Sequence, residues 1–265
     1  MRTLGGTNPL LPMQRSVAGL AVHLLWTGGW DSTYRLLSLV LVEGARVQPH
    51  YIADTSRRST LLELRTMHHI RQAVAAVSPE GAARIAPTRI VSVHDIAPAP
   101  EITARRNRLT RRAYLGGQYD WLARFAAQFD IPALELCIHV DDKAHAFISE
   151  HVEQVEGEYW QLRKELVDTD LSLFRYFRFP VLHLTKLEMD RLARQHGFHE
   201  IMQKTWFCHS PWRGRPCGIC NPCVYTAEEG MAHRLRPLAR LSYTLLPVLS
   251  VVREARRFVR RVAKR

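Results

Sequence analysis

Apolar residues along the chain fall into short continuous runs, which alternate with stretches of helical periodicity. The continuous runs predict five strands, at residues 20–26, 47–53, 88–94, 133–140 and 179–184. The periodic stretches between and after them predict five helices, at residues 32–43, 61–77, 112–129, 144–166 and 186–196. Uninterrupted apolar strands are typical of sheets covered on both faces. Five repeats of strand then helix therefore predict an α/β fold: an open, parallel, five-stranded sheet with helices on both faces.

The chain divides into four parts by this pattern. Residues 1–16 are rich in glycine and proline without periodicity, and we expect a flexible leader. Residues 17–205 carry the α/β alternation, although the proline- and arginine-rich stretch 95–110 inside them is expected to be a loop. A cysteine-rich segment, 206–226, and a basic C-terminal tail, 227–265, complete the chain.

The apolar run at residues 17–26 has two interpretations. It resembles the hydrophobic region of a signal peptide, but no small-residue cleavage site follows it. No apolar run reaches the ~20 residues that a membrane-spanning helix needs. A buried strand is the better interpretation. Five cysteines among 265 residues are too few for a secreted disulfide scaffold, and a hydrophobic content of 46% suits a globular core. We expect a cytoplasmic protein.

The first predicted strand runs directly into the sequence Thr-Gly-Gly-Trp-Asp-Ser-Thr at residues 27–33, where a helix begins. Adjacent glycines allow a sharp turn and a close approach to an anion. Backbone N–H groups at a helix N-terminus, with hydroxyls beside them, form an anion site. The end of the first parallel strand is also where open α/β sheets bind ligands. The alternative is a plain glycine turn in which Asp31 caps the helix.

Four cysteines lie within 16 residues of one another, at Cys208, Cys217, Cys220 and Cys223. Short Cys-x-x-Cys spacings place two thiolates on one metal ion, and four thiolates make a closed structural zinc site. Two disulfides would require an oxidising compartment. An iron–sulfur cluster is the other alternative, because the spacing does not determine the metal.

The pattern hydroxyl-Gly-Gly-x-Asp-Ser at residues 27–32 resembles the phosphate loop (PP-loop) of the N-type ATP pyrophosphatases. The segments Lys-Thr-Trp-Phe-Cys-His at 204–209 and Pro-Cys-Gly-Ile-Cys-Asn-Pro-Cys at 216–223 narrow the resemblance to the 7-cyano-7-deazaguanine synthase family, over about residues 20–226. The resemblance implies a Rossmann-like domain of the adenine nucleotide alpha hydrolase type. It also implies the cofactors ATP, Mg²⁺ and Zn²⁺.

The implied reaction belongs to queuosine biosynthesis. In this family, ATP and ammonia convert a 7-deazaguanine carboxylate to an amide and then to a nitrile, with release of AMP and pyrophosphate. The resemblance gives Asp31 and Ser32 a catalytic role. Seven residues are expected to contact the nucleotide, the last of them at the end of the second strand: Thr27, Gly28, Gly29, Asp31, Ser32, Thr33 and Asp54.

Two segments differ from the family pattern. Asp-Thr-Ser-Arg-Arg occupies residues 54–58, after the second strand, and Arg-Arg-Ala-Tyr-Leu-Gly-Gly-Gln occupies residues 111–118, where the family carries its substrate loop. The alternatives are a paralogue that amidates or ligates a different carboxylate, and a tRNA-modifying PP-loop enzyme. Asp141 and Asp142, after the fourth strand, are candidates to hold Mg²⁺ or to cap the next helix.

The formal net charge is +12, and half of this excess lies in residues 253–265, which contain seven basic residues and one acidic residue. Apolar residues recur at helical spacing between the arginines from Val251 to Val262, which predicts a basic amphipathic helix. This helix would pack on the domain, or bind an anionic membrane surface or RNA. The other expected partners are a small-molecule carboxylate, ammonia or another amine, and a second copy of the chain in a homodimer.

Overall fold

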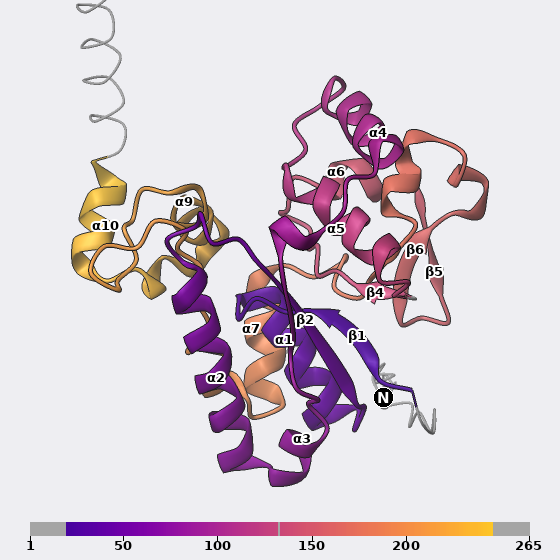
Figure 1. The fold of residues 1–265 in the computed structure, drawn as a ribbon. Helices are drawn as coiled ribbons and strands as arrows, with labels where there is room; N and C mark the ends of the chain where they lie inside the picture. The colour runs from indigo at the N-terminus through magenta and orange to yellow at the C-terminus, as the bar shows by residue number, and fades with distance from the viewer. Residues whose placement is uncertain (1–19, 132, 246–265) are drawn as a thin grey trace, which may run out of the picture.

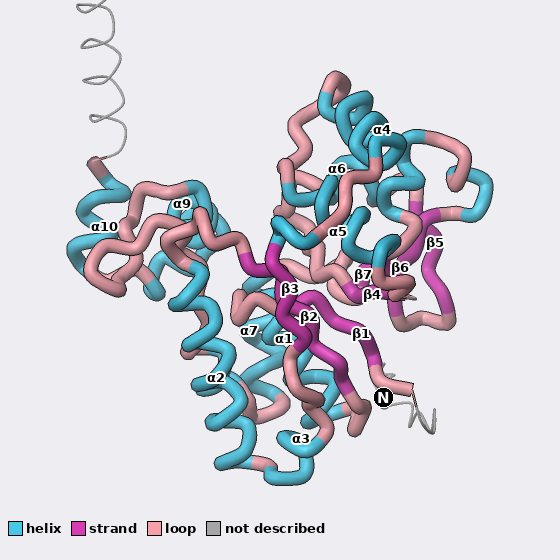
Figure 2. The backbone as a smooth tube through the Cα atoms, viewed as in Figure 1, coloured by secondary structure: helices cyan, strands magenta, loops and turns pink. Residues whose placement is uncertain are grey.

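The computed structural model describes residues 20–131 and 133–245 of the chain. These residues form an α/β fold around one mixed sheet of seven strands, ordered β3-β2-β1-β4-β7-β6-β5 (Figures 1 and 2). The strands are β1 (Val22–Leu25), β2 (Val47–Ala53), β3 (Arg89–Ser92), β4 (Leu134–Glu135), β5 (Val152–Val155), β6 (Tyr159–Leu162) and β7 (Phe177–Phe179). The leader at 1–16 and the amphipathic helix expected after residue 250 lie outside the described residues.

The five predicted strands correspond to β1, β2, β3, β4 and β7, and these five pair in parallel. The prediction of five strands in total is wrong, because β5 and β6 extend the sheet as an antiparallel hairpin beside β7. They occupy the region predicted as the helix 144–166. Glu156 and Gly157 both have positive φ, 49° and 75°, and join the two strands in a tight turn.

Successive residues of the central strands enter two separate cores, since side chains alternate between the faces of a strand. Leu24 of β1 belongs to one core and Leu25 to the other. The first core packs against α1 (Trp30–Leu37), α2 (Thr60–Val77) and α7 (Lys186–Gln195). The second packs against α4 (Pro100–Thr110) and α5 (Gln118–Gln128). The expectation of helices on both faces of the sheet is confirmed.

The remaining helices differ in part from the sequence-based expectation. They are α3 (Pro79–Ala83), α4 (Pro100–Thr110), α5 (Gln118–Gln128), α6 (His145–Ile148), α8 (His199–Met202), α9 (Asn221–Thr226) and α10 (Pro237–Thr244). The helix α4 replaces the loop expected at 95–110. Pro100 provides its preset first turn, and Ile102 and Leu109 bury one face. Asp170 pairs with Arg108 on this helix at 2.7 Å.

Two strands of the parallel set are shorter than expected. The run 133–140 provides only the two residues of β4, and the strand expected at 179–184 ends at Phe179 and begins earlier, at Phe177. Beyond β4 the chain leaves the sheet, and residues 139–143 form turns above its edge. Within the described residues, no helix is both long enough and apolar enough to cross a membrane.

Candidate functional site

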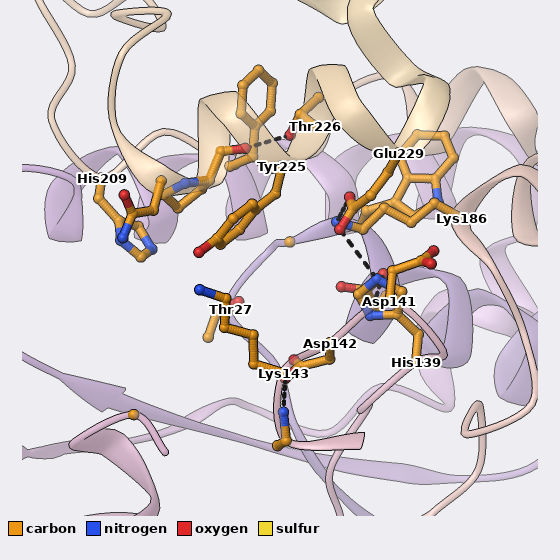
Figure 3. A pocket seen from close by; sticks show the side chains of 18 of the residues that line it. Thr27, His139, Asp141, Asp142, Lys143, Lys186, His209, Tyr225, Thr226 and Glu229 are labelled. Carbon is orange, nitrogen blue, oxygen red and sulfur yellow. Dashed lines mark hydrogen bonds and ion pairs between the residues drawn. The ribbon is translucent and has the colours of Figure 1, made fainter. Parts of the chain in front are cut away.

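The order of the parallel strands reverses between β1 and β4, where β2 and β3 extend to one side and β7 to the other. Ligands of open α/β sheets bind at this point, outside the carboxyl ends of the strands. Residues 27–31 follow β1 and residues 139–143 follow β4, and both segments line one cavity of about 510 Å³ (Figure 3). The sequence-predicted phosphate loop therefore opens into this cavity.

The phosphate loop is shaped by its two glycines. Gly28 has a φ of +72°, and a Cβ there would lie 3.1 Å from Thr66 Cγ2 and 3.2 Å from Met67 Cγ. Gly29 is the N-cap of α1, with extended backbone and no side-chain cap. The first backbone N–H groups of α1 are therefore not occupied by a capping side chain, and they remain available to an anion.

The predicted residues of the phosphate loop lie at two depths: some line the cavity, and others are buried behind it. Thr27, Gly29 and Asp31 line the cavity. Ser32 and Thr33 are buried behind it, and the Thr33 hydroxyl accepts a hydrogen bond from Trp26 Nε1 at 3.0 Å. Thr33 therefore supports the loop from within.

Asp54 does not line this cavity. Its carboxylate accepts hydrogen bonds from the backbone N–H of Ser56, at 3.0 Å, and from the Ser56 hydroxyl, at 2.6 Å. This is the local capping geometry that aspartate adopts in turns. Contact of Asp54 with a nucleotide stays a prediction.

Four charged side chains meet on one wall of the cavity. Lys186 Nζ lies 2.6 Å from one oxygen of Glu229, and His139 Nε2 lies 3.5 Å from the other. On its other side, His139 Nδ1 lies 3.9 Å from Asp31 Oδ1. This cluster joins the phosphate loop, the segment after β4, the start of α7 and the segment after α9 (Figure 3).

The electrostatics of this cluster favour its charged forms. Burial disfavours the cationic forms of His139 and Lys186, but the neighbouring Asp31 and Glu229 outweigh it and raise both pKa values. Burial likewise opposes ionisation of Glu229, but His139 and Lys186 lower its pKa. A lysine with a fixed position and a stable positive charge beside a phosphate loop is suited to neutralise an anionic ligand.

Sequence reasoning missed His139 and Glu229 of this cluster. His139 could have been found, because it follows a predicted strand at the same sheet edge as the loop. Glu229 and Arg234 gave no signal, since the segment that carries them reaches the cavity only by folding back over it. Both candidate magnesium ligands, Asp141 and Asp142, line the cavity. Asp141 is exposed, and Asp142 Oδ1 accepts a hydrogen bond from Ala144 N at 2.8 Å. Burial raises the pKa of Asp142.

The four cysteines of residues 208–223 form a single cluster, in which all sulfur atoms lie within 4.8 Å of one another. Four thiolates about 2.3 Å from one ion define a tetrahedron with edges of about 3.8 Å. The contacts of Cys220 with Cys208 and Cys223 are 3.8 and 3.5 Å, and Cys217 lies 3.7 and 4.0 Å from the same two residues. These distances fit a single tetrahedral ion.

The same geometry fits one tetrahedral ion better than the two alternatives for these cysteines. The sulfur atoms are too far apart for disulfides, whose S–S length is about 2.05 Å. In a four-iron cluster each thiolate binds a different iron, which would hold the sulfurs further apart than one tetrahedron does. Backbone N–H groups of Cys217 and Cys220 also point at sulfur, at 3.3 and 3.4 Å, as expected around thiolates that share a metal.

The cysteine segment closes the cavity and contacts the phosphate loop. The backbone N–H of Trp206 donates to the carbonyl of Gly28 at 2.9 Å. Tyr225 and Thr226 of α9 line the opposite side of the cavity from the loop after β4 (Figure 3). A metal ion in the four-cysteine cluster would therefore fix one wall of the candidate site without contacting a ligand inside it.

No family model matches the sequence, and no curated protein matches it. Among solved structures, the chain is similar to a 4-thiouridine synthetase in complex with RNA and with bound ATP, at 15% sequence identity and a TM-score of 0.36. The match covers 84% of this chain and 53% of the other, so the chain spans about half the length of that protein.

Proposed function

We propose that the protein is an ATP-dependent enzyme that adenylates a small carboxylate and passes it to ammonia, with 7-cyano-7-deazaguanine synthesis as the specific reaction. The observation that carries the proposal is the position of the glycine turn. It lies at the strand-order reversal, at a helix N-terminus, and opens into a cavity that Lys186 lines. An anion held there would meet backbone N–H groups from one side and a paired lysine from the other.

Different residues of the chain would carry out different parts of such a reaction. Thr27 and the first N–H groups of α1 would bind the departing pyrophosphate, and Lys186 would stabilise the charge that develops on it. Asp31 and Asp141 are the carboxylates that would hold Mg²⁺, which prefers one or two carboxylates together with phosphate oxygens. The Mg²⁺ ion would neutralise phosphate charge. The four-cysteine cluster would hold Zn²⁺ as a structural ion.

The cysteine inventory supports a nitrogen nucleophile rather than sulfur transfer. The sequence holds five cysteines, and four of them form the metal-binding cluster. Burial raises the pKa of the fifth, Cys137, well above its ordinary value, so its thiolate is disfavoured. A sulfur-transferring enzyme that works through a protein thiolate would need a reactive, accessible cysteine. If ammonia attacks the adenylate, no protein nucleophile is required.

The second candidate is a PP-loop enzyme that modifies RNA. A separate cavity beside the site favours it, because four basic side chains and no acidic ones line that cavity. The same ATP chemistry would then act on a group carried by a nucleic acid. The two candidates differ in substrate and share the phosphate loop.

The test is a turnover assay with the full, zinc-loaded chain. The protein is incubated with ATP, Mg²⁺, ammonium and 7-deazaguanine carboxylate, and AMP, amide and nitrile are followed by mass spectrometry. Lys186→Met should lower the rate of AMP formation by about 10²–10³-fold. Lys164→Met is the matched control, because Lys164 is exposed and does not line the cavity.

Each result has a distinct meaning. Nitrile together with AMP supports the full proposal, and amide alone supports adenylation that stops at the first product. AMP formation only in the presence of RNA favours the second candidate. If the folded, metal-loaded protein binds no ATP and forms no AMP under any of these conditions, the proposed function is wrong.

A further inference from the structure

A second cavity, of about 340 Å³, lies beside the first and takes no part in the adenylation and amidation proposed above as the main function. It is formed by residues 203–207, by residues 214–216 of the cysteine segment, and by Arg234 and Arg236. Four basic side chains line it, and none of its lining residues is acidic: Lys204, Arg215, Arg234 and Arg236. The excess positive charge of the chain is therefore locally concentrated in a concave surface.

Arg234 is the most buried of these four side chains. Its Nη2 donates to the backbone carbonyl and to the hydroxyl of Thr205, at 2.7 and 2.6 Å. Its guanidinium lies 4.7 Å from the ring centre of Trp30 and 5.0 Å from that of Phe207. Burial lowers the pKa of Arg234 to about 10, against the opposing effect of Asp31 and Asp190. The group is thus held rigidly in a place that disfavours its charge.

Other arginines of the chain have their charge balanced by a carboxylate. Arg35 has Glu135 at 2.8 Å, and Arg124 has Asp120 at 3.0 Å. In the part of the chain that the structure describes, none of the four cations of the second cavity forms an ion pair with a carboxylate. An anion bound in this hollow would be attracted by four cations, none of which has a carboxylate in contact.

We propose that the second cavity is a binding site for a phosphate group. Guanidinium groups match phosphate oxygens in pairs, and a lysine adds a point charge, so this set of side chains suits phosphate better than a single carboxylate. Lys204 and Arg236 are exposed at the rim of the cavity, whereas Arg234 provides its fixed inner donor.

The two cavities share a wall made of Trp206, Phe207 and Arg234. A ligand whose phosphate group occupies the second cavity would extend across this wall toward the first. This part of the inference rests on the proposed function: the substrate would be an acid attached to a phosphate, either a phosphorylated small molecule or an RNA. Binding of phosphate itself does not depend on any reaction at the phosphate loop.

The experiment is calorimetric titration of the full, zinc-loaded chain with inorganic phosphate. A non-hydrolysable ATP analogue and Mg²⁺ are present to occupy the phosphate loop. We expect one phosphate per chain in the wild type. The double variant Lys204→Gln/Arg236→Gln should weaken binding by at least about tenfold, since each charge-assisted contact contributes substantially. A Ser32→Ala variant should bind phosphate as the wild type does.

The matched control is the double variant Arg213→Gln/Lys164→Gln, which removes the same number of exposed charges. Neither residue lines the second cavity, and Arg213 instead lies over the ring of Trp212. Equal phosphate affinity in the two double variants, or no binding to the wild type, overturns the proposal. Weaker binding in Ser32→Ala alone assigns the phosphate to the loop and also overturns it.

The source of the phosphate is distinguished by a second titration. Fluorescence anisotropy of a labelled eight-nucleotide RNA is measured with and without inorganic phosphate as competitor. If phosphate displaces the RNA and the Lys204→Gln/Arg236→Gln variant binds the RNA more weakly, a nucleic-acid phosphate occupies the site. If phosphate binds but does not compete with RNA, the site takes the phosphate of a small molecule. A failed turnover assay would leave both titrations interpretable.

Discussion

The backbone N–H of Trp206 donates a hydrogen bond of 2.9 Å to the carbonyl of Gly28. This contact joins the segment that carries the first metal-binding cysteine to the strained glycine of the phosphate loop. These two segments are separated in sequence by almost the whole α/β domain, and the conformation of each depends on the other. Loss of the metal ion is therefore expected to impair anion binding at the phosphate loop as well.

Removal of the metal tests this dependence. Cys217→Ala removes one of four ligands, and we expect loss of bound zinc and a large decrease in AMP formation. Cys137→Ala is the matched control, because this cysteine lies outside the cluster and should leave the metal content at one ion per chain. Metal content is measured by elemental analysis and AMP by mass spectrometry. Full ATP turnover in a metal-free variant would contradict the dependence.

Substitution of Gly28 should damage the loop through two separate effects. Gly28→Ala adds a side chain at a φ of +72° and places its Cβ against Thr66 and Met67. The positive φ alone costs about 1–3 kcal/mol in the free energy of unfolding. The contact forces the loop to move, and a displacement of about 1 Å can lower the rate by about 100-fold.

The control for Gly28 is Gly197→Ala, at the end of α7. Gly197 has a φ of +77°, and a Cβ there would meet nothing within 4 Å. This variant should lose stability from the backbone strain and keep its ATP turnover. Urea unfolding and the AMP assay on both variants separate the two effects. Equal turnover in the two variants would show that the close approach to α2 does not shape the loop.

The ion pair between Arg35 and Glu135 is expected to contribute most among the pairs in the described part of the chain. Both nitrogen–oxygen contacts are 2.8 Å, and Glu135 on the central strand β4 is 3% exposed. Glu135→Gln would leave the buried Arg35 with only its partly exposed partner Glu43, at 2.7 Å, so the variant should lower the free energy of unfolding by at most about 3–5 kcal/mol.

Glu80 provides the comparison for this pair. It contacts Arg84 one helical turn away, and its side chain is 80% exposed. Glu80→Gln should cost less than about 1 kcal/mol, because water screens an exposed pair. Urea denaturation of both variants gives the two values. If they agree, burial of Glu135 does not determine its contribution.

Stability should decrease as the pH falls from about 6.5 to about 4. His50 is 1% exposed and lies 2.9 Å from His23, and burial lowers its pKa from 6.5 to about 4. In this pH range the unfolded chain binds a proton that the folded chain does not, so acid favours unfolding. The loss amounts to at most about 3 kcal/mol. It is present in full below pH 4 and absent above pH 6.5.

His50→Leu provides the test for this pH dependence. The variant should show a shallower decrease in the free energy of unfolding between pH 6.5 and pH 4, measured by urea denaturation at several pH values. His68→Leu, on the outer side of α2, is the control and should retain the slope of the wild type. An unchanged slope in His50→Leu would assign the acid sensitivity to other groups.

The hydrophobic pattern predicted the structure best where it follows a single period, either that of a strand or that of a helix. The strand predicted at 47–53 matches β2, and the helix predicted at 61–77 matches α2 within one residue. It failed at 144–166, where Val152–Val155 and Tyr159–Leu162 form a hairpin. The glycine at 157 between runs rich in strand-forming residues was the available signal for a short hairpin turn.

Only those parts of the candidate site that lie within a short stretch of sequence were predictable. The glycine turn and the cysteine spacing each lie within a short stretch of sequence, so their chemistry is readable from neighbouring residues. The cluster of Asp31, His139, Lys186 and Glu229 depends on four segments that only the folded chain brings together. Periodicity and spacing report local geometry, and they contain no information on which distant segments meet.

Gly218 lies between two of the metal-binding cysteines, with a φ of +80°. A Cβ at this position would collide with the backbone of Ala239 in α10, some twenty residues later in the chain. The need for glycine here comes from the helix that covers the cysteine loop as well as from the turn. In any related chain in which a larger residue replaces this glycine, the last described helix has to sit elsewhere. The identity of residue 218 therefore indicates whether a relative can adopt the same C-terminal arrangement.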